Sequence, residues 1–179
     1  MVVKAIFIGL LFSFLLLVSC KQPSVDTRWV KLKSKIRREF PTVRHMSVAD
    51  LSSLLTQDGG AKPILLDVRD AKEYAVSHLP GAYPVIAESK AFDILKDVDK
   101  SQLVVAYCSV GYRSSRLAEK LIEAGYSNVF NLEGSIFEWA NRGHAVFRGD
   151  SEVSEVHPYD EDWGMLLNEP MRRYEVESK

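Results

Sequence analysis

The segment LVVAYCSVGYRSSRLAEKLIEAG, residues 103–125, decides the fold of this chain. Its first five residues are apolar or aromatic and include adjacent valines, a composition typical of a strand buried in a sheet. Residues 114–125 instead place their large aliphatic side chains on one helical face, and Gly125 is suited to end the helix. Cys108 lies between the two patterns. The segment therefore predicts a strand, a short cysteine loop and a helix.

The same alternation extends in both directions along the chain. Strands are predicted at 43–46, 63–68, 82–85, 103–107 and 128–132, and helices at 47–55, 70–77, 88–98, 114–125 and 135–143. Alternating strands and helices form parallel sheets, because each helix carries the chain back across a face of the sheet. We therefore expect an α/β domain with a central, mainly parallel sheet and helices on both faces.

Length and charge limit the class of protein further. A chain of 179 residues suits one domain of this kind with its own core. Its 23 basic residues are balanced by 24 acidic ones, so charge does not favour a nucleic-acid partner. The four histidines do not have the spacing of metal ligands.

The beginning of the chain has the features of an export signal. Residues 5–18 are almost entirely apolar, which is too short a run to span a bilayer but suits a signal-peptide core. The following Leu17-Val18-Ser19-Cys20 resembles a bacterial lipobox. This resemblance implies that residues 1–19 are a lipoprotein signal peptide and that Cys20 carries the lipid; a plain secretory signal or a short uncleaved anchor are the alternatives. We expect a lipid-anchored protein of the bacterial cell envelope that faces the periplasm, with the outer membrane favoured over the inner.

If Cys20 is acylated, Cys108 has no cysteine left with which to form an intramolecular disulfide. One interpretation is an inert, buried thiol. The alternative is a nucleophile, because Cys108 follows the predicted central strand, where open α/β sheets bind ligands. The unpaired amides of the loop, the helix N-terminus and Arg113 would favour a thiolate there.

Several motifs together resemble those of a single-domain rhodanese, a sulfurtransferase. They are Asp67-Val68-Arg69, Glu73-Tyr74, the HLPGA turn at 78–82, the Cys108–Arg113 loop, and Leu132-Glu133-Gly134 before Trp139. The resemblance covers about 43–147, and we assign 42–148 to the domain. It implies that Cys108 takes a sulfane sulfur from a small donor (thiosulfate, a persulfide or a polysulfide) and passes it to cyanide or a thiol. It implies no metal or organic cofactor, and it leaves room for a protein partner.

The resemblance also assigns roles to residues. Cys108 is the nucleophile; the substrate-binding candidates are Ser109, Val110, Gly111, Tyr112, Arg113 and Arg69, and Asp67 supports the loop. Alternatives stay open: Asp67 and Arg69 form a structural ion pair with Glu73 or Arg113, Arg113 holds the loop through an acidic neighbour, and Val110 and Tyr112 pack inward. Some thiosulfate-using members carry a cation inside the loop where this chain does not, which puts thiosulfate in doubt as the donor.

Two rival functions remain. Related phosphatases have five residues between cysteine and arginine, whereas four separate Cys108 from Arg113, and the shorter loop favours sulfur. The second rival is a lipoprotein that uses the rhodanese fold for binding, or for redox or persulfide sensing, without catalysis.

The two flanks of the domain have their own patterns. Within a tether at 20–41, residues 26–40 predict a basic amphipathic helix that lies either on an anionic membrane or on the domain. The extension at 149–179 holds nine acidic residues against three basic ones, together with large apolar side chains. We expect this extension to lie against the domain.

Overall fold

The computed structural model describes residues 24–175. The leader and Cys20 lie outside these residues, so the signal peptide and the lipobox stay predictions. In the described part, no helix combines the length and the apolar character needed to cross a membrane.

Within residues 24–175, a five-stranded parallel sheet forms the centre of the domain in the order β1-β5-β4-β2-β3. The strands are β1 (Arg44–Met46), β2 (Ile64–Asp67), β3 (Tyr83–Pro84), β4 (Val104–Tyr107) and β5 (Val129–Leu132). All four residues of β4 are buried between β2 and β5. The predicted α/β class and parallel sheet are confirmed, and the residues after β4 emerge at the carboxyl edge of its centre.

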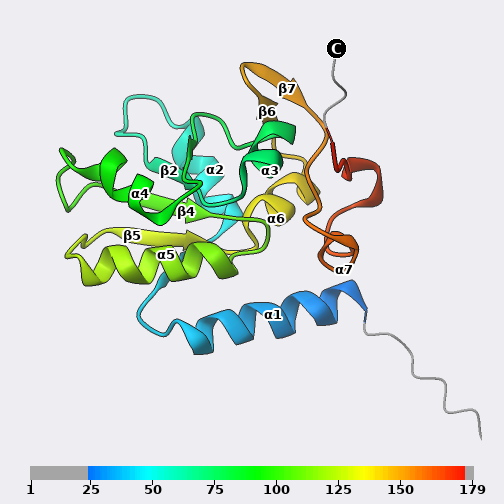
Figure 1. Ribbon diagram of the computed structural model, residues 1–179, viewed down its shortest axis with the longest axis horizontal. Helices are drawn as coiled ribbons and strands as arrows, with labels where there is room; N and C mark the ends of the chain where they lie inside the picture. Colours follow the sequence, from blue (N-terminus) through cyan, green and yellow to red (C-terminus); the bar gives the residue numbers. More distant parts are fainter. Residues whose placement is uncertain (1–23, 176–179) are drawn as a thin grey trace, which may run out of the picture.

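Helices connect the strands across both faces of the sheet (Figure 1). They are α2 (Val48–Thr56), α3 (Ala71–Val76), α4 (Glu88–Leu95), α5 (Tyr112–Glu123) and α6 (Ser135–Asn141). Ser47 caps α2, because its Oγ accepts a hydrogen bond from the Asp50 amide. Helix α5 begins two residues earlier than predicted, since Gly111 already caps it in a left-handed conformation. Helix α4 is shorter than predicted and ends at Leu95.

The basic helix before the domain is α1 (Val25–Glu39), and it packs on the domain. Leu32 and Ile36 are buried within the core, and the Phe40 ring lies edge-on to that of Tyr112 at 5.3 Å. Figure 1 shows α1 running alongside α5. Its apolar face is thus covered by protein, which favours the packing interpretation over a helix lying on a membrane.

The extension lies against the domain, as expected. Val156, Leu166 and Leu167 are buried, and α7 (Glu161–Gly164) lies beside α1 in Figure 1. The 3-10 helix Glu169–Met171 follows α7 in this extension. Strands β6 (Val146–Arg148) and β7 (Ser151–Val153) form an antiparallel hairpin, so the domain boundary predicted at residue 148 falls inside this hairpin.

Candidate active site

Cys108 directly follows β4 at the carboxyl edge of the sheet and borders a pocket. The residue is only 1% exposed, yet it lines a pocket of about 240 Å³. The backbone amide of Gly111 donates a hydrogen bond to the sulfur over 3.1 Å. The thiol is therefore turned toward the loop amides and the pocket.

Gly111 and helix α6 shape the cysteine loop. Gly111 has a φ of +108°, and a Cβ there would lie 3.1 Å from the Asn131 side-chain nitrogen, so another residue would be strained. The amides of Ile136 and Phe137, in the first turn of α6, donate to the carbonyl oxygens of Cys108 and Ser109 over 3.2 and 3.1 Å. With those carbonyls held by α6, the loop can present the Gly111 amide to the sulfur.

Ser135 ties the same helix to the nucleophile. Its Oγ accepts a hydrogen bond from the Cys108 amide over 3.1 Å and donates to the carbonyl of Leu132. Sequence reasoning missed this residue. The Leu132-Glu133-Gly134 motif directly before it is the signal that could have found it.

Glu73, which sequence reasoning did not assign to the site, holds the loop from the side of α3. Its buried carboxylate accepts hydrogen bonds from both terminal nitrogens of Arg113 at 2.8 Å and from Ser109 Oγ at 2.9 Å. Burial alone raises the pKa of Glu73, but the hydrogen bonds and positive charge of Arg113 outweigh it and lower the pKa to about 2. This pairing supports the alternative in which Arg113 holds the loop through an acidic neighbour.

The surroundings of Cys108 favour its ionised form. Burial opposes this by raising the pKa of the thiol, but the charge of Arg113 and the hydrogen bonds of Ser114 and Gly111 lower it further than burial raises it. The net result is a pKa below the ordinary value for cysteine. A larger thiolate fraction near neutral pH makes the sulfur a better nucleophile.

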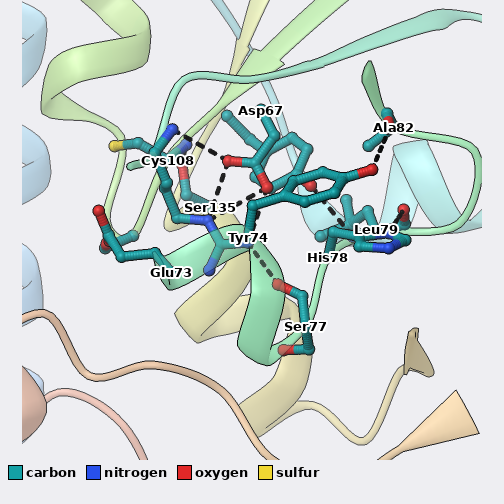
Figure 2. A network of polar contacts seen from close by, with 12 residues as sticks. Asp67, Glu73, Tyr74, Ser77, His78, Leu79, Ala82, Cys108 and Ser135 are labelled. Atoms are coloured by element: carbon teal, nitrogen blue, oxygen red, sulfur yellow. Dashed lines mark hydrogen bonds and ion pairs between the residues drawn. The ribbon is translucent and has the colours of Figure 1, made fainter. Parts of the chain in front are cut away.

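Arg69 does not reach the pocket, and this contradicts its prediction as an anion-binding residue. The side chain is 1% exposed, pairs with Asp67 over 2.7 Å and donates to the Ser77 carbonyl. Figure 2 labels both partners, Asp67 and Ser77, within one network of polar contacts. The positive charge of Arg69 is balanced by the Asp67 carboxylate inside the protein. The structural ion pair foreseen as the alternative does form, but between Arg69 and Asp67 themselves. Asp67 does not line the pocket either, and its contact with Tyr107 places it beside the end of β4, one residue before Cys108.

The other predicted residues lie around the sulfur. Ser109, Val110, Tyr112 and Arg113 line the pocket with Cys108, while Gly111 contacts the sulfur through its amide. Four further lining residues were not predicted: Leu32, Lys35, Tyr159 and Trp163. The apolar face of the first helix and the aromatic tail were visible in the sequence, but nothing connected them to the cysteine. Among residues 24–175, His, Cys, Asp and Glu form no cluster suited to hold a metal.

Comparisons with known proteins agree with this architecture. Residues 47–142 match the model of the family described as Rhodanese-like domain. The tRNA uridine(34) hydroxylase of Yersinia enterocolitica is 27% identical over 133 residues, which are 71% of this chain and 37% of that protein. A probable adenylyltransferase/sulfurtransferase MoeZ of Mycobacterium tuberculosis is 33% identical over 87 residues, 48% of this chain and 22% of its own length. The chain thus spans well under half the length of these curated relatives.

Solved structures share the fold. The thiosulfate sulfurtransferase of Pseudomonas aeruginosa superposes with a TM-score of 0.57 at 22% identity, over 69% of this chain and 23% of that one. The Alr3790 protein of Anabaena gives a TM-score of 0.51 at 25% identity, over 57% of this chain and 80% of that one. At 22% identity, the similarity to the Pseudomonas aeruginosa protein shows a shared fold and nothing more.

Proposed function

The chain belongs to the rhodanese-like domain family, and from this premise we propose that it is a sulfurtransferase that carries a sulfane sulfur on Cys108. The observation that supports the proposal most strongly is the position of the Cys108 sulfur. It borders a pocket and accepts a hydrogen bond from the Gly111 amide over 3.1 Å. The neighbouring charge of Arg113 lowers the pKa of the thiol. Both features also suit an anionic persulfide at the same position.

The reaction has two steps that use the same sulfur. The Cys108 thiolate attacks the outer sulfur of the donor, and the donor's own bond to that sulfur breaks. Its electron pair leaves with sulfite if the donor is thiosulfate, or with a thiolate if the donor is a persulfide. Cyanide or a thiol then attacks the outer sulfur of the Cys108 persulfide and regenerates the thiolate. The cycle needs no external oxidant or reductant.

Mass spectrometry of the intact chain tests the proposal directly. We expect exposure to thiosulfate, polysulfide or an organic persulfide to add the mass of one sulfur atom to the peptide that contains Cys108. Cyanide should remove this sulfur and yield an equal amount of thiocyanate. If none of these donors modifies Cys108, the proposal is wrong and a binding module of the same fold takes its place.

We also propose that a lipid on Cys20 anchors the protein in the bacterial cell envelope. The protein would face the periplasm, and the outer membrane is favoured over the inner membrane as its location. The support is the apolar run at 5–18 and the lipobox-like residues that follow it. We expect that Cys20→Ala prevents lipid attachment, so that a lipid-modified N-terminal peptide is no longer found by mass spectrometry. The protein should then move from the membrane fraction to the soluble fraction. Sulfur transfer in detergent extracts should be unchanged, because it is assigned to Cys108. A variant that stays in the membrane would indicate an uncleaved anchor instead.

A further inference from the structure

The pocket around Cys108 is completed by residues from outside the segment that matches the family model. That segment is 47–142, whereas α1 contributes Leu32 and Lys35, and the C-terminal extension contributes Tyr159 and Trp163. We call these four residues the flank wall. Since they line the same pocket as the cysteine loop, they can contact the part of a substrate that extends beyond the reacting sulfur.

Local contacts hold the flank wall in place. Leu32 is 8% exposed within the main core. The Tyr159 ring lies 5.0 Å from the Arg113 guanidinium, and the Tyr159 amide donates to Nδ1 of His157 over 3.0 Å. Helix α7, which carries Trp163, is capped by Asp160 through the Trp163 amide at 2.8 Å. The wall is therefore built by packing and capping.

The chemistry of the pocket is apolar with a cationic side. Leu32, Tyr159 and Trp163 offer aliphatic and aromatic surface, while Lys35 adds a positive charge 5.5 Å from the centre of the Tyr112 ring. Lys35 has an exposed ion pair with Glu39 at 3.8 Å, which solvent weakens. This leaves much of its charge available to an anion.

The size of the pocket points the same way. Its 240 Å³ could hold about eight water molecules at about 30 Å³ each, which is more room than a small inorganic anion occupies. Apolar surface gains little from contact with an inorganic dianion, but it stabilises an aromatic or aliphatic group through burial and ring contacts. Volume and lining together favour a donor with an organic body.

Resting on the proposed function, we propose that the donor is an organic anion whose outer sulfur reacts with Cys108 while its apolar body lies against the flank wall. For a thiosulfonate of this kind, the Cys108 thiolate forms a bond to the outer sulfur, and the sulfur-sulfur bond of the donor breaks. The electron pair leaves with the sulfinate, and the enzyme keeps the persulfide. Charge and atoms balance without a co-reactant.

Two donors that differ only in their body test this inference in the full-length protein. Benzenethiosulfonate and methanethiosulfonate carry the same reacting sulfur and the same charge. We expect kcat/KM to be about tenfold higher for the benzene compound, a difference typical of one apolar contact in a pocket. Thiosulfate serves as the inorganic reference and should react less well than benzenethiosulfonate.

Variants locate the preference on the flank wall. Trp163→Ala should lower the benzene-to-methane ratio of kcat/KM about tenfold, to near one, because the apolar contact is lost. Trp163→Phe should keep most of the ratio, and Trp163→Gln gives the same test as alanine if that variant unfolds. Tyr83→Ala removes an exposed aromatic ring outside the pocket and should leave the ratio unchanged.

The charge of Lys35 is tested separately. Lys35→Gln should raise KM several-fold for both organic donors and preserve their ratio, because the two carry the same charge. Lys31→Gln, on the same helix but outside the pocket lining, is the matched control and should have no such effect.

The outcomes separate the inference from the proposed function. A ratio near one in the unaltered protein, or a ratio that Trp163→Ala leaves unchanged, overturns the role of the flank wall. Persulfide formation on Cys108 would in that case still support the sulfurtransferase. If no donor forms a persulfide, the proposed function itself fails, and the inference fails with it.

Discussion

Replacing Cys108 by serine should lower kcat/KM for sulfur transfer by about a thousandfold or more and leave the fold intact. The serine hydroxyl does not ionise near neutral pH and does not form a persulfide, so the first step loses its nucleophile and the second step loses the persulfide that the acceptor attacks. The substitution is nearly isosteric, and the serine oxygen can still accept the Gly111 amide that the sulfur accepts now. The loop therefore keeps its shape.

Thiocyanate release from cyanide and a sulfane donor measures the activity of Cys108→Ser, and thermal unfolding followed by circular dichroism measures its stability. Cys20→Ser is the matched control, because it removes the other cysteine of the chain and should retain the activity. Substantial turnover by Cys108→Ser would show that the nucleophile lies elsewhere.

Replacing Glu73 by glutamine should destabilise the protein by about 2–4 kcal/mol at neutral pH, near the lower end of the range for breaking a buried ion pair. The glutamine leaves the Arg113 charge without its counter-charge and cannot accept hydrogen bonds at both oxygens. The effect is moderated because the Arg113 side chain is 31% exposed and partly solvated. Urea unfolding at neutral pH measures the loss, and exposed Glu152→Gln is the control. A loss no larger than that of the control would contradict the role of Glu73.

The same pair predicts a pH dependence of the free energy of unfolding. The pKa of Glu73 is lowered from 4.5 to about 2 in the folded protein, so the folded state binds this proton less readily than the unfolded chain. Its stabilisation is complete above pH 4.5 and is lost as the pH falls from about 4.5 toward 2. We expect Glu73→Gln to lack this part of the acid sensitivity. Parallel curves for the two proteins across that range would refute the assignment.

Arg113 and Arg69 illustrate how far the candidate site could be predicted. Both follow a predicted strand, and for each the sequence left the same two roles open, an anion contact or a structural ion pair with a carboxylate. The structure separates them by burial: Arg69 is enclosed with Asp67, whereas Arg113 pairs with Glu73 and still borders the pocket. Partner choice among several nearby carboxylates depends on side-chain directions that spacing does not give.

By itself, the sequence determined the α/β class, the strand, cysteine loop and helix at 103–125, and the place of Cys108 between that strand and that helix. These follow from contiguous residues, because strand and helix periodicity are local properties. Only the tertiary structure decided that Glu73, Ser135 and the flank wall meet at the cysteine loop and its pocket. The order of the strands and the packing of α1 and the C-terminal extension bring these residues together from distant parts of the chain. Contacts of that kind depend on how whole elements pack, which no local pattern encodes.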